Sequence, residues 1–79
     1  MTREYQFNIL LQDRCTRSEA ENFLNKNRVT IYEDPAEYIQ MLKDNDCYEG
    51  QTLEDYRRGL PDHSMVMYEG HEYLIAYEN

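Results

Sequence analysis

Three helix-start signals constrain the fold of this chain more than any other feature of its sequence. Thr16 with Glu19 three residues later forms a capping box, and Thr52 with Asp55 gives a similar signal. The Asp34-Pro35 pair combines a good N-cap with the residue preferred at the first helical position. Asn-rich or Gly-containing stretches follow each segment and favour helix ends. The predicted helices cover residues 17–26, 35 to about 45, and 53–58, with Gly59 and Pro61 ending the third.

The remaining patterned segments predict strands. Residues 5–11 alternate between apolar and mostly amide side chains, which is the clearest period of two in the chain. Residues 29–33 are β-branched and aromatic, as is typical of a short strand. Residues 65–68 and 72–77 flank a Gly-containing turn and predict a terminal hairpin. The expected order of elements is therefore β-α-β-α-α-β-β.

This order predicts one compact α+β domain over residues 1–79, because so short a chain does not divide its core. We expect a three- to four-stranded mixed or antiparallel sheet with two to three helices packed on one face. The other face of the last strand would then be solvated or covered by a partner. The expected core residues are Phe7, Ile9, Leu11, Phe23, Leu24, Ile31, Ile39, Leu42, Leu53, Val66, Leu74 and Ala76.

The net charge of −8 is unevenly distributed along the chain. Residues 1–28 hold five basic and four acidic residues, a net charge of +1, whereas residues 29–79 hold three basic and twelve acidic residues, a net charge of −9. Such a chain is poorly suited to direct contact with nucleic-acid phosphates, which needs clustered Lys and Arg. It suits a partner with a basic surface, although acids also belong at helix starts and keep small proteins soluble.

The acidic segment and the eight tyrosines indicate an interaction surface. Tyr is enriched at interfaces, and carboxylates with aromatic rings hold Arg-rich surfaces through ion pairs and cation–π contacts. A row of carboxylates can also mimic nucleic acid in a basic groove. Half-buried tyrosines framing a small core are the alternative interpretation. The candidate partner-binding residues are Glu33, Asp34, Glu37, Asp44, Asp46, Tyr48, Glu49, Glu54, Asp55 and Tyr73.

Signals for catalysis or metal binding are weak. Cys15, Cys47, His63 and His71 are 32, 16 and 8 residues apart, whereas zinc ligands usually come in close pairs. The three glycines form no phosphate-binding loop. We therefore predict no metal, no cofactor and no catalytic residue. A very small hydrolase using a Cys–His pair, or a metal protein, remains a third alternative.

The expected cellular location follows from the lack of apolar segments that would direct the chain to or across a membrane. No apolar run approaches the roughly 18 residues needed to cross a bilayer, and no apolar segment follows Met1 as in a signal peptide. Two cysteines do not make a disulfide framework. We expect a cytoplasmic protein with reduced thiols and no membrane partner.

In size, acidity, tyrosine content and lack of catalytic motifs, the chain resembles the small accessory proteins of phages and mobile elements. Anti-CRISPR and other anti-defence inhibitors are a prominent group among them. The resemblance rests on overall character and not on a shared motif, so no residue roles are transferred. It implies a non-enzymatic inhibitor that blocks a basic surface, such as that of a CRISPR or other nucleic-acid-binding effector. The alternative is a small structural or regulatory subunit acting as a homodimer or complex component.

Overall fold

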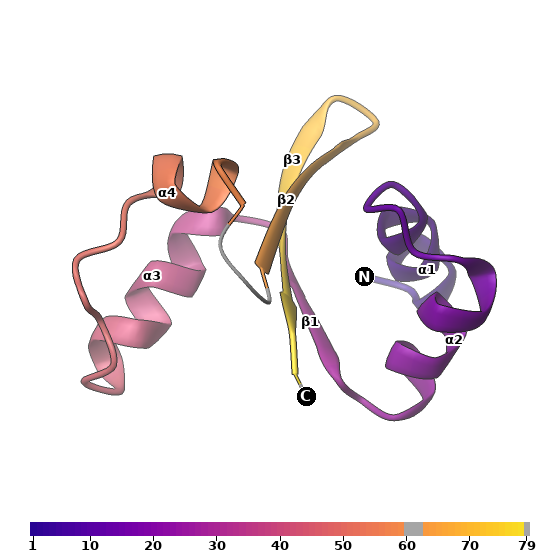
Figure 1. The fold of residues 1–79 in the computed structure, drawn as a ribbon, viewed down its shortest axis with the longest axis horizontal. Coiled ribbons are helices and arrows are strands. Elements are labelled where there is room, and N and C mark those ends of the chain that lie inside the picture. The colour runs from indigo at the N-terminus through magenta and orange to yellow at the C-terminus, as the bar shows by residue number, and fades with distance from the viewer. Residues whose placement is uncertain (60–62, 79) are drawn as a thin grey trace.

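The computed structural model describes residues 1–59 and 63–78, which form four helices and three strands (Figure 1). Pro61, expected to end the third predicted helix, lies outside the described residues. The elements in chain order are α1 (Arg3–Leu11), α2 (Arg17–Asn25), β1 (Val29–Tyr32), α3 (Pro35–Asp44), α4 (Leu53–Arg57), β2 (His63–Tyr68) and β3 (His71–Tyr77).

The three strands form an antiparallel sheet in the order β1-β3-β2. The last strand of the chain is therefore the central one, and Ile75 of β3 lies opposite Ile31 of β1. The predicted terminal hairpin is confirmed, with Tyr68 paired to His71 across a two-residue turn. Glu69 and Gly70 in this turn have φ values of 51° and 78°, as two-residue hairpin turns require.

The predicted strand over residues 5–11 is wrong, because this segment forms helix α1. The alternating apolar residues also include pairs four positions apart, such as Tyr5 with Ile9, so the pattern fits a helical face as well. Leu10, assigned to the polar face of a strand, is fully buried beside Ile9. The Thr2 hydroxyl caps the helix by accepting from the Tyr5 amide. The observed order is α-α-β-α-α-β-β, with three strands.

The three predicted helix starts are confirmed. Thr16 and Glu19 form the capping box of α2, and Thr52 forms the corresponding box of α4 with its N3 aspartate. The Asp34 carboxylate caps α3 by accepting from the Ala36 amide at 3.0 Å. Each of these helices ends within about a residue of the expected position, the usual uncertainty of a helix boundary.

Helices cover both faces of the sheet, so the expectation that all helices pack on one face is wrong. Figure 1 shows α1 and α2 on one side of the strands and α3 and α4 on the other. Ile75 and Tyr73 of β3 pack in the cluster under α1 and α2, whereas Leu74 and Ala76 pack with Tyr38 and Tyr56 of the other layer. A central strand buried on both faces has no polar alternation, which explains the run of apolar residues from 73 to 76.

The core differs from the expected one mainly in its tyrosines. Five expected core residues are buried, namely Ile9, Ile31, Val66, Leu74 and Ala76. The other seven, Phe7, Leu11, Phe23, Leu24, Ile39, Leu42 and Leu53, are half-buried. Tyr38, Tyr56 and Tyr73 are buried in their place, together with Leu10, Ala20 and Ile75. The core consists of two thin clusters, one on each face of a three-stranded sheet. Many apolar side chains therefore lie at the edge of a cluster, where they are only half-buried.

Candidate interaction surface

The sheet separates a nearly neutral helical layer from an acidic one. The segment 1–28, which contains α1 and α2, has a net charge of +1. The segment 33–58, which contains α3 and α4, holds eight acidic and three basic residues, a net charge of −5. Because these helices cover opposite faces of the sheet (Figure 1), the charge asymmetry of the sequence becomes an asymmetry in space. We call the exposed side of α3, α4 and their flanking loops the acidic layer.

Nine of the ten predicted binding residues belong to the acidic layer. Eight are exposed, namely Glu33, Asp34, Glu37, Asp44, Asp46, Tyr48, Glu49 and Glu54, and Asp55 is half-buried. Tyr73 does not belong there, because its side chain is only 3% exposed and lies in the cluster under α1 and α2. Its hydroxyl is 2.8 Å from the Tyr5 hydroxyl. The assignment of Tyr73 to the binding surface is therefore corrected: its ring is part of the core.

Two of the acidic side chains cap helices. The Asp34 carboxylate holds the first turn of α3, as described above. The Asp55 carboxylate accepts from the Thr52 amide at 2.8 Å, and the hydrogen bonds from Thr52 lower the pKa of Asp55. The position of both carboxylates therefore has a structural cause that needs no partner.

Two further carboxylates share one arginine. Arg57 of α4 makes two hydrogen bonds with Glu72 of β3, with Nε–Oε2 and Nη2–Oε1 distances of 3.0 and 2.9 Å. Arg57 also pairs with Glu54 in its own helix. The guanidinium lowers the pKa of Glu72, and it neutralises much of the charge of both partners. This pairing ties α4 to the hairpin, although exposed ion pairs contribute little to stability.

Other carboxylates are available to a partner. The side chains of Glu33, Glu37 and Asp46 make no hydrogen bond or ion pair with the described part of the chain. The Asp44 carboxylate accepts from the Gln40 amide at 2.9 Å, and Glu49 is 3.5 Å from the Gln51 amide. The negative charge of these residues is not neutralised by an ion pair within the described part of the chain.

The available carboxylates form two groups at opposite ends of α3. Glu33 and Glu37 lie at its beginning, whereas Asp44, Asp46 and Glu49 lie at and after its end. A helix of ten residues is about 15 Å long, which sets the spacing of the two groups. The Tyr48 ring is part of the second group, with the Lys43 ammonium 5.0 Å from its centroid.

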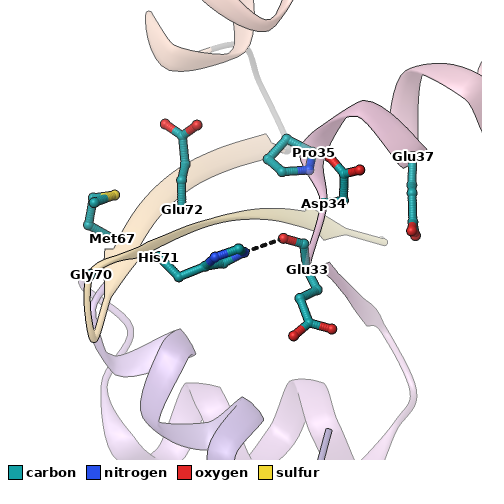
Figure 2. Close-up of a pocket in the computed structure, with 8 residues that line it drawn as sticks. All are labelled: Glu33, Asp34, Pro35, Glu37, Met67, Gly70, His71 and Glu72. Carbon is teal, nitrogen blue, oxygen red and sulfur yellow. Dashed lines mark hydrogen bonds between the residues drawn. The ribbon is translucent and has the colours of Figure 1, made fainter.

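An open hollow lies beside the first group (Figure 2), with a volume of about 820 Å³. The junction between β1 and α3 lines one side, and the β2–β3 hairpin lines the other. The His71 ring joins the two sides, since its Nε2 is hydrogen-bonded to the Glu33 backbone oxygen. We call this feature the hairpin hollow, and its lining residues are Glu33, Asp34, Pro35, Glu37, Met67, Gly70, His71 and Glu72.

Sequence reasoning did not identify Met67, His71 and Glu72 as neighbours of the acidic layer. They lie more than 30 positions after Glu33 in the chain, and only the antiparallel pairing of β3 with β1 brings them close. The observed register of the hairpin places Met67 and Glu72 opposite each other on one face. The predicted hairpin, with residues 69–71 between its strands, did not give this register.

The cysteines and histidines lie in separate environments. The Cys15 thiol is 3.5 Å from the Tyr77 hydroxyl, and burial raises its pKa. The Cys47 thiol is exposed and 3.2 Å from the Asn45 carbonyl oxygen.

Among residues 1–59 and 63–78, no group of three or more Cys, His, Asp or Glu is arranged to hold a metal ion. In the same residues, no helix is long and apolar enough to cross a membrane.

Comparison with known proteins identifies no relative. No model of a protein family matches the chain, and neither a curated protein nor a solved structure is significantly similar to it. A functional assignment therefore has to be argued from the surface of this molecule.

Proposed function

We propose that this protein is a non-enzymatic binding protein that docks its acidic layer on a basic surface of a partner and blocks it, as an anti-CRISPR-type inhibitor would. The observation that carries the proposal is the separation of charge by the sheet, with −5 on the segment of α3 and α4 and +1 on that of α1 and α2. Solubility alone would be served equally well by acids spread over both layers.

The mechanism is electrostatic steering followed by steric exclusion. A concentrated negative surface accelerates encounter with a positive one and disfavours wrong partners. Carboxylates at both ends of α3 would face Lys and Arg side chains that otherwise contact nucleic acid. The sheet and the α1–α2 layer would then lie over the basic surface of the partner and keep nucleic acid from binding there.

Charge reversal tests the proposal with a matched control. Asp44→Lys with Glu49→Lys changes the acidic layer, whereas Glu4→Lys with Glu21→Lys makes the same change in net charge on α1 and α2. Asp46 is left unchanged because its φ of 55° makes substitution costly. Immobilised wild-type protein first retains its partner from the native host, and the affinity of that purified partner is then measured for each form.

We expect the acidic-layer variant to bind at least about tenfold more weakly, a loss of ~1.4 kcal/mol, and the control variant to bind as wild type. Wild-type affinity should also fall steeply as salt is raised, since exposed charges are screened. Affinity that is indifferent to ionic strength, or equally reduced in both variants, would contradict the proposal.

A second candidate function is a regulatory subunit that pairs through a sheet edge. The order β1-β3-β2 leaves β1 and β2 each with one edge unpaired among the described strands. Such edges can pair with another copy or another chain. Light scattering separates the two functions, because a stable dimer at micromolar concentration favours the subunit and a monomer favours the inhibitor.

A further inference from the structure

One end of the sheet face under α3 and α4 is not covered by helix. Along β2, Met65 packs against the cluster formed with α3 and α4. Met67, two residues further and on the same face, is 61% exposed. The opposite face is closed at the same end, where the rings of Tyr68 and Tyr5 are 5.2 Å apart. The hairpin hollow is therefore an open part of an otherwise covered sheet face.

The hollow combines two apolar side chains, Met67 and Pro35, with several carboxylates. Met67 is a flexible, polarisable side chain that adapts to different apolar partners. Glu37 is unpaired within the described chain, while Glu72 is already held by Arg57. The Glu33 side chain points away from Met67 and Glu72, as Figure 2 shows. None of the described residues that line the hollow is Lys or Arg. Its charge complements a cation and repels an anion.

The walls of the hollow are held in place by contacts within the fold. The ring of His71 joins the hairpin to the Glu33 backbone oxygen, as Figure 2 shows. The Asp34 carboxylate fixes the first turn of α3, and Arg57 fixes Glu72. A preformed site saves the cost of ordering on binding, which is the physical difference between this hollow and a loose row of acids.

We propose that the hairpin hollow binds an arginine of the partner protein together with an apolar residue next to it. The guanidinium would pair with the carboxylate of Glu37, and the apolar side chain would cover Met67. Arginine fits better than lysine because its planar guanidinium is weakly hydrated and matches the geometry of a carboxylate with two hydrogen bonds. This inference rests on the proposed function and names the partner chemistry at one part of the acidic layer.

Nuclear magnetic resonance of the full chain with ¹³C-methyl methionine tests the site directly. Three acetylated, amidated pentapeptides serve as probes, with the sequences Arg-Leu-Arg-Leu-Arg, Arg-Ser-Arg-Ser-Arg and Glu-Leu-Glu-Leu-Glu. The Met67 methyl signal reports the hollow. The Met41 methyl signal serves as an internal reference, because this side chain packs in the cluster of α3 and α4.

We expect the Arg-Leu peptide to shift the Met67 signal in a saturable way and to leave Met41 unchanged. The Arg-Ser peptide should bind at least about threefold more weakly, because it cannot cover Met67 with apolar surface. The Glu-Leu peptide should cause no shift. An unmoved Met67 signal, or equal affinity for the two Arg peptides, would overturn the inference.

Variants separate this site from the rest of the acidic layer. Glu37→Gln should weaken Arg-Leu binding at least about threefold, and Met67→Ala should remove the difference between the two Arg peptides, as followed by the amide signals of Gly70 and His71. Asp44→Asn with Glu49→Gln, at the other end of α3, is the matched control and should leave peptide binding unchanged. Both hollow variants alter exposed side chains, and thermal melts verify that they fold.

The outcomes distinguish failure of this site from failure of the proposed function. If the Asp44 and Glu49 changes weaken binding of the native partner while Glu37→Gln and Met67→Ala do not, the hollow is not the contact and the docking function stands. If neither set affects partner binding, the docking function fails as well. Met67 shifts that depend on protein concentration without peptide would instead place a second copy in the hollow and overturn the inference.

Discussion

Tyrosines of this chain are mostly part of the core and not of the surface. Of the eight, Tyr38, Tyr56 and Tyr73 are buried, and only Tyr48 is exposed, at 37%. A buried hydroxyl needs a partner: the Tyr73 hydroxyl lies beside Tyr5, and Tyr38 contacts the His63 ring. Burial raises the pKa values of Tyr38 and Tyr56. At the scale of single residues, the alternative that tyrosines frame a small core is confirmed for most of them.

One residue of the hairpin turn has an unfavourable backbone conformation. Glu69 has a φ of 51°, a region that Asn adopts more readily than Glu. We predict that Glu69→Asn stabilises the protein by about 0.5 kcal/mol, measured by urea denaturation. Glu21→Asn in the middle of α2 is the control and should destabilise slightly through lower helix propensity. A loss of stability in Glu69→Asn would show that its 3.5 Å contact with the Tyr5 hydroxyl matters more than the turn.

At the scale of elements, α4 is too short to be stable alone. It has five residues, and isolated helices shorter than about 12 residues are marginal in water. Three contacts hold it: the capping box at Thr52, the pairing of Arg57 with Glu72, and the burial of Tyr56. The same argument applies to α1, whose apolar residues form a helix only because α2 and the sheet bury them.

The cap of α4 predicts a pH dependence of stability. The folded pKa of Asp55 is lowered below its ordinary value of 3.8, so its stabilisation is present above that value and is lost as pH falls through the lower folded pKa. Thr52→Ala removes the hydrogen bonds of the Thr52 hydroxyl with Asp55, whereas the backbone N–H of residue 52, the larger cause of the lowered pKa, stays in place as a donor. We expect Thr52→Ala to destabilise the protein clearly at pH 7 and less at pH 2.5, because protonation of Asp55 toward low pH removes the part of the stabilisation that the Thr52 hydroxyl gives to the carboxylate. Urea midpoints at the two pH values measure this difference.

Thr16→Ala, which removes the hydroxyl from the corresponding capping box of α2, provides a comparison. It should destabilise at pH 7 through the lost cap, by about 1 kcal/mol. If Thr52→Ala were equally destabilising at both pH values, the Thr52 hydroxyl would not contribute to the lowered pKa of Asp55.

At the scale of the whole molecule, one central strand supports two separate clusters. Leu74 and Ile75 are adjacent in β3 and fully buried, yet they face opposite helical layers. Neither layer can be removed without exposing one face of β3 to water. The separation of acidic and nearly neutral layers depends on this arrangement, because the sheet is what divides them.

Because the core lies on both faces of the sheet, the adjacent residues Leu74 and Ile75 should contribute about equally to the free energy of unfolding. We predict that Leu74→Ala and Ile75→Ala each lower the free energy of unfolding by about 2–4 kcal/mol. A sheet with one open face would make one of them nearly neutral. Met67→Ala, on an exposed part of the same sheet, is the control and should change stability by less than about 0.5 kcal/mol. Should the alanine variants fail to fold, Ile75→Val, at about 1 kcal/mol, makes the same test.

The candidate site was predictable only in part. Residues from Glu33 to Asp55 were identified because their charge is concentrated in one stretch of sequence, and the structure places them together around α3 and α4. Met67 and His71 were not identified, since the pairing of distant strands brings them to the hollow. Tyr73 was assigned to the surface because strand alternation defines two faces without showing which of them is covered.

The sequence by itself determined the features that depend on residues within about four positions of each other. These are the three helix starts, the hairpin turn and the uneven charge, because caps and turns are made by near neighbours. Tertiary structure alone decided that residues 5–11 form a helix and that helices cover both faces of the sheet. It also decided that the acids of α3 meet the hairpin. These features depend on burial between distant segments, and burial overrides a local pattern that fits more than one structure.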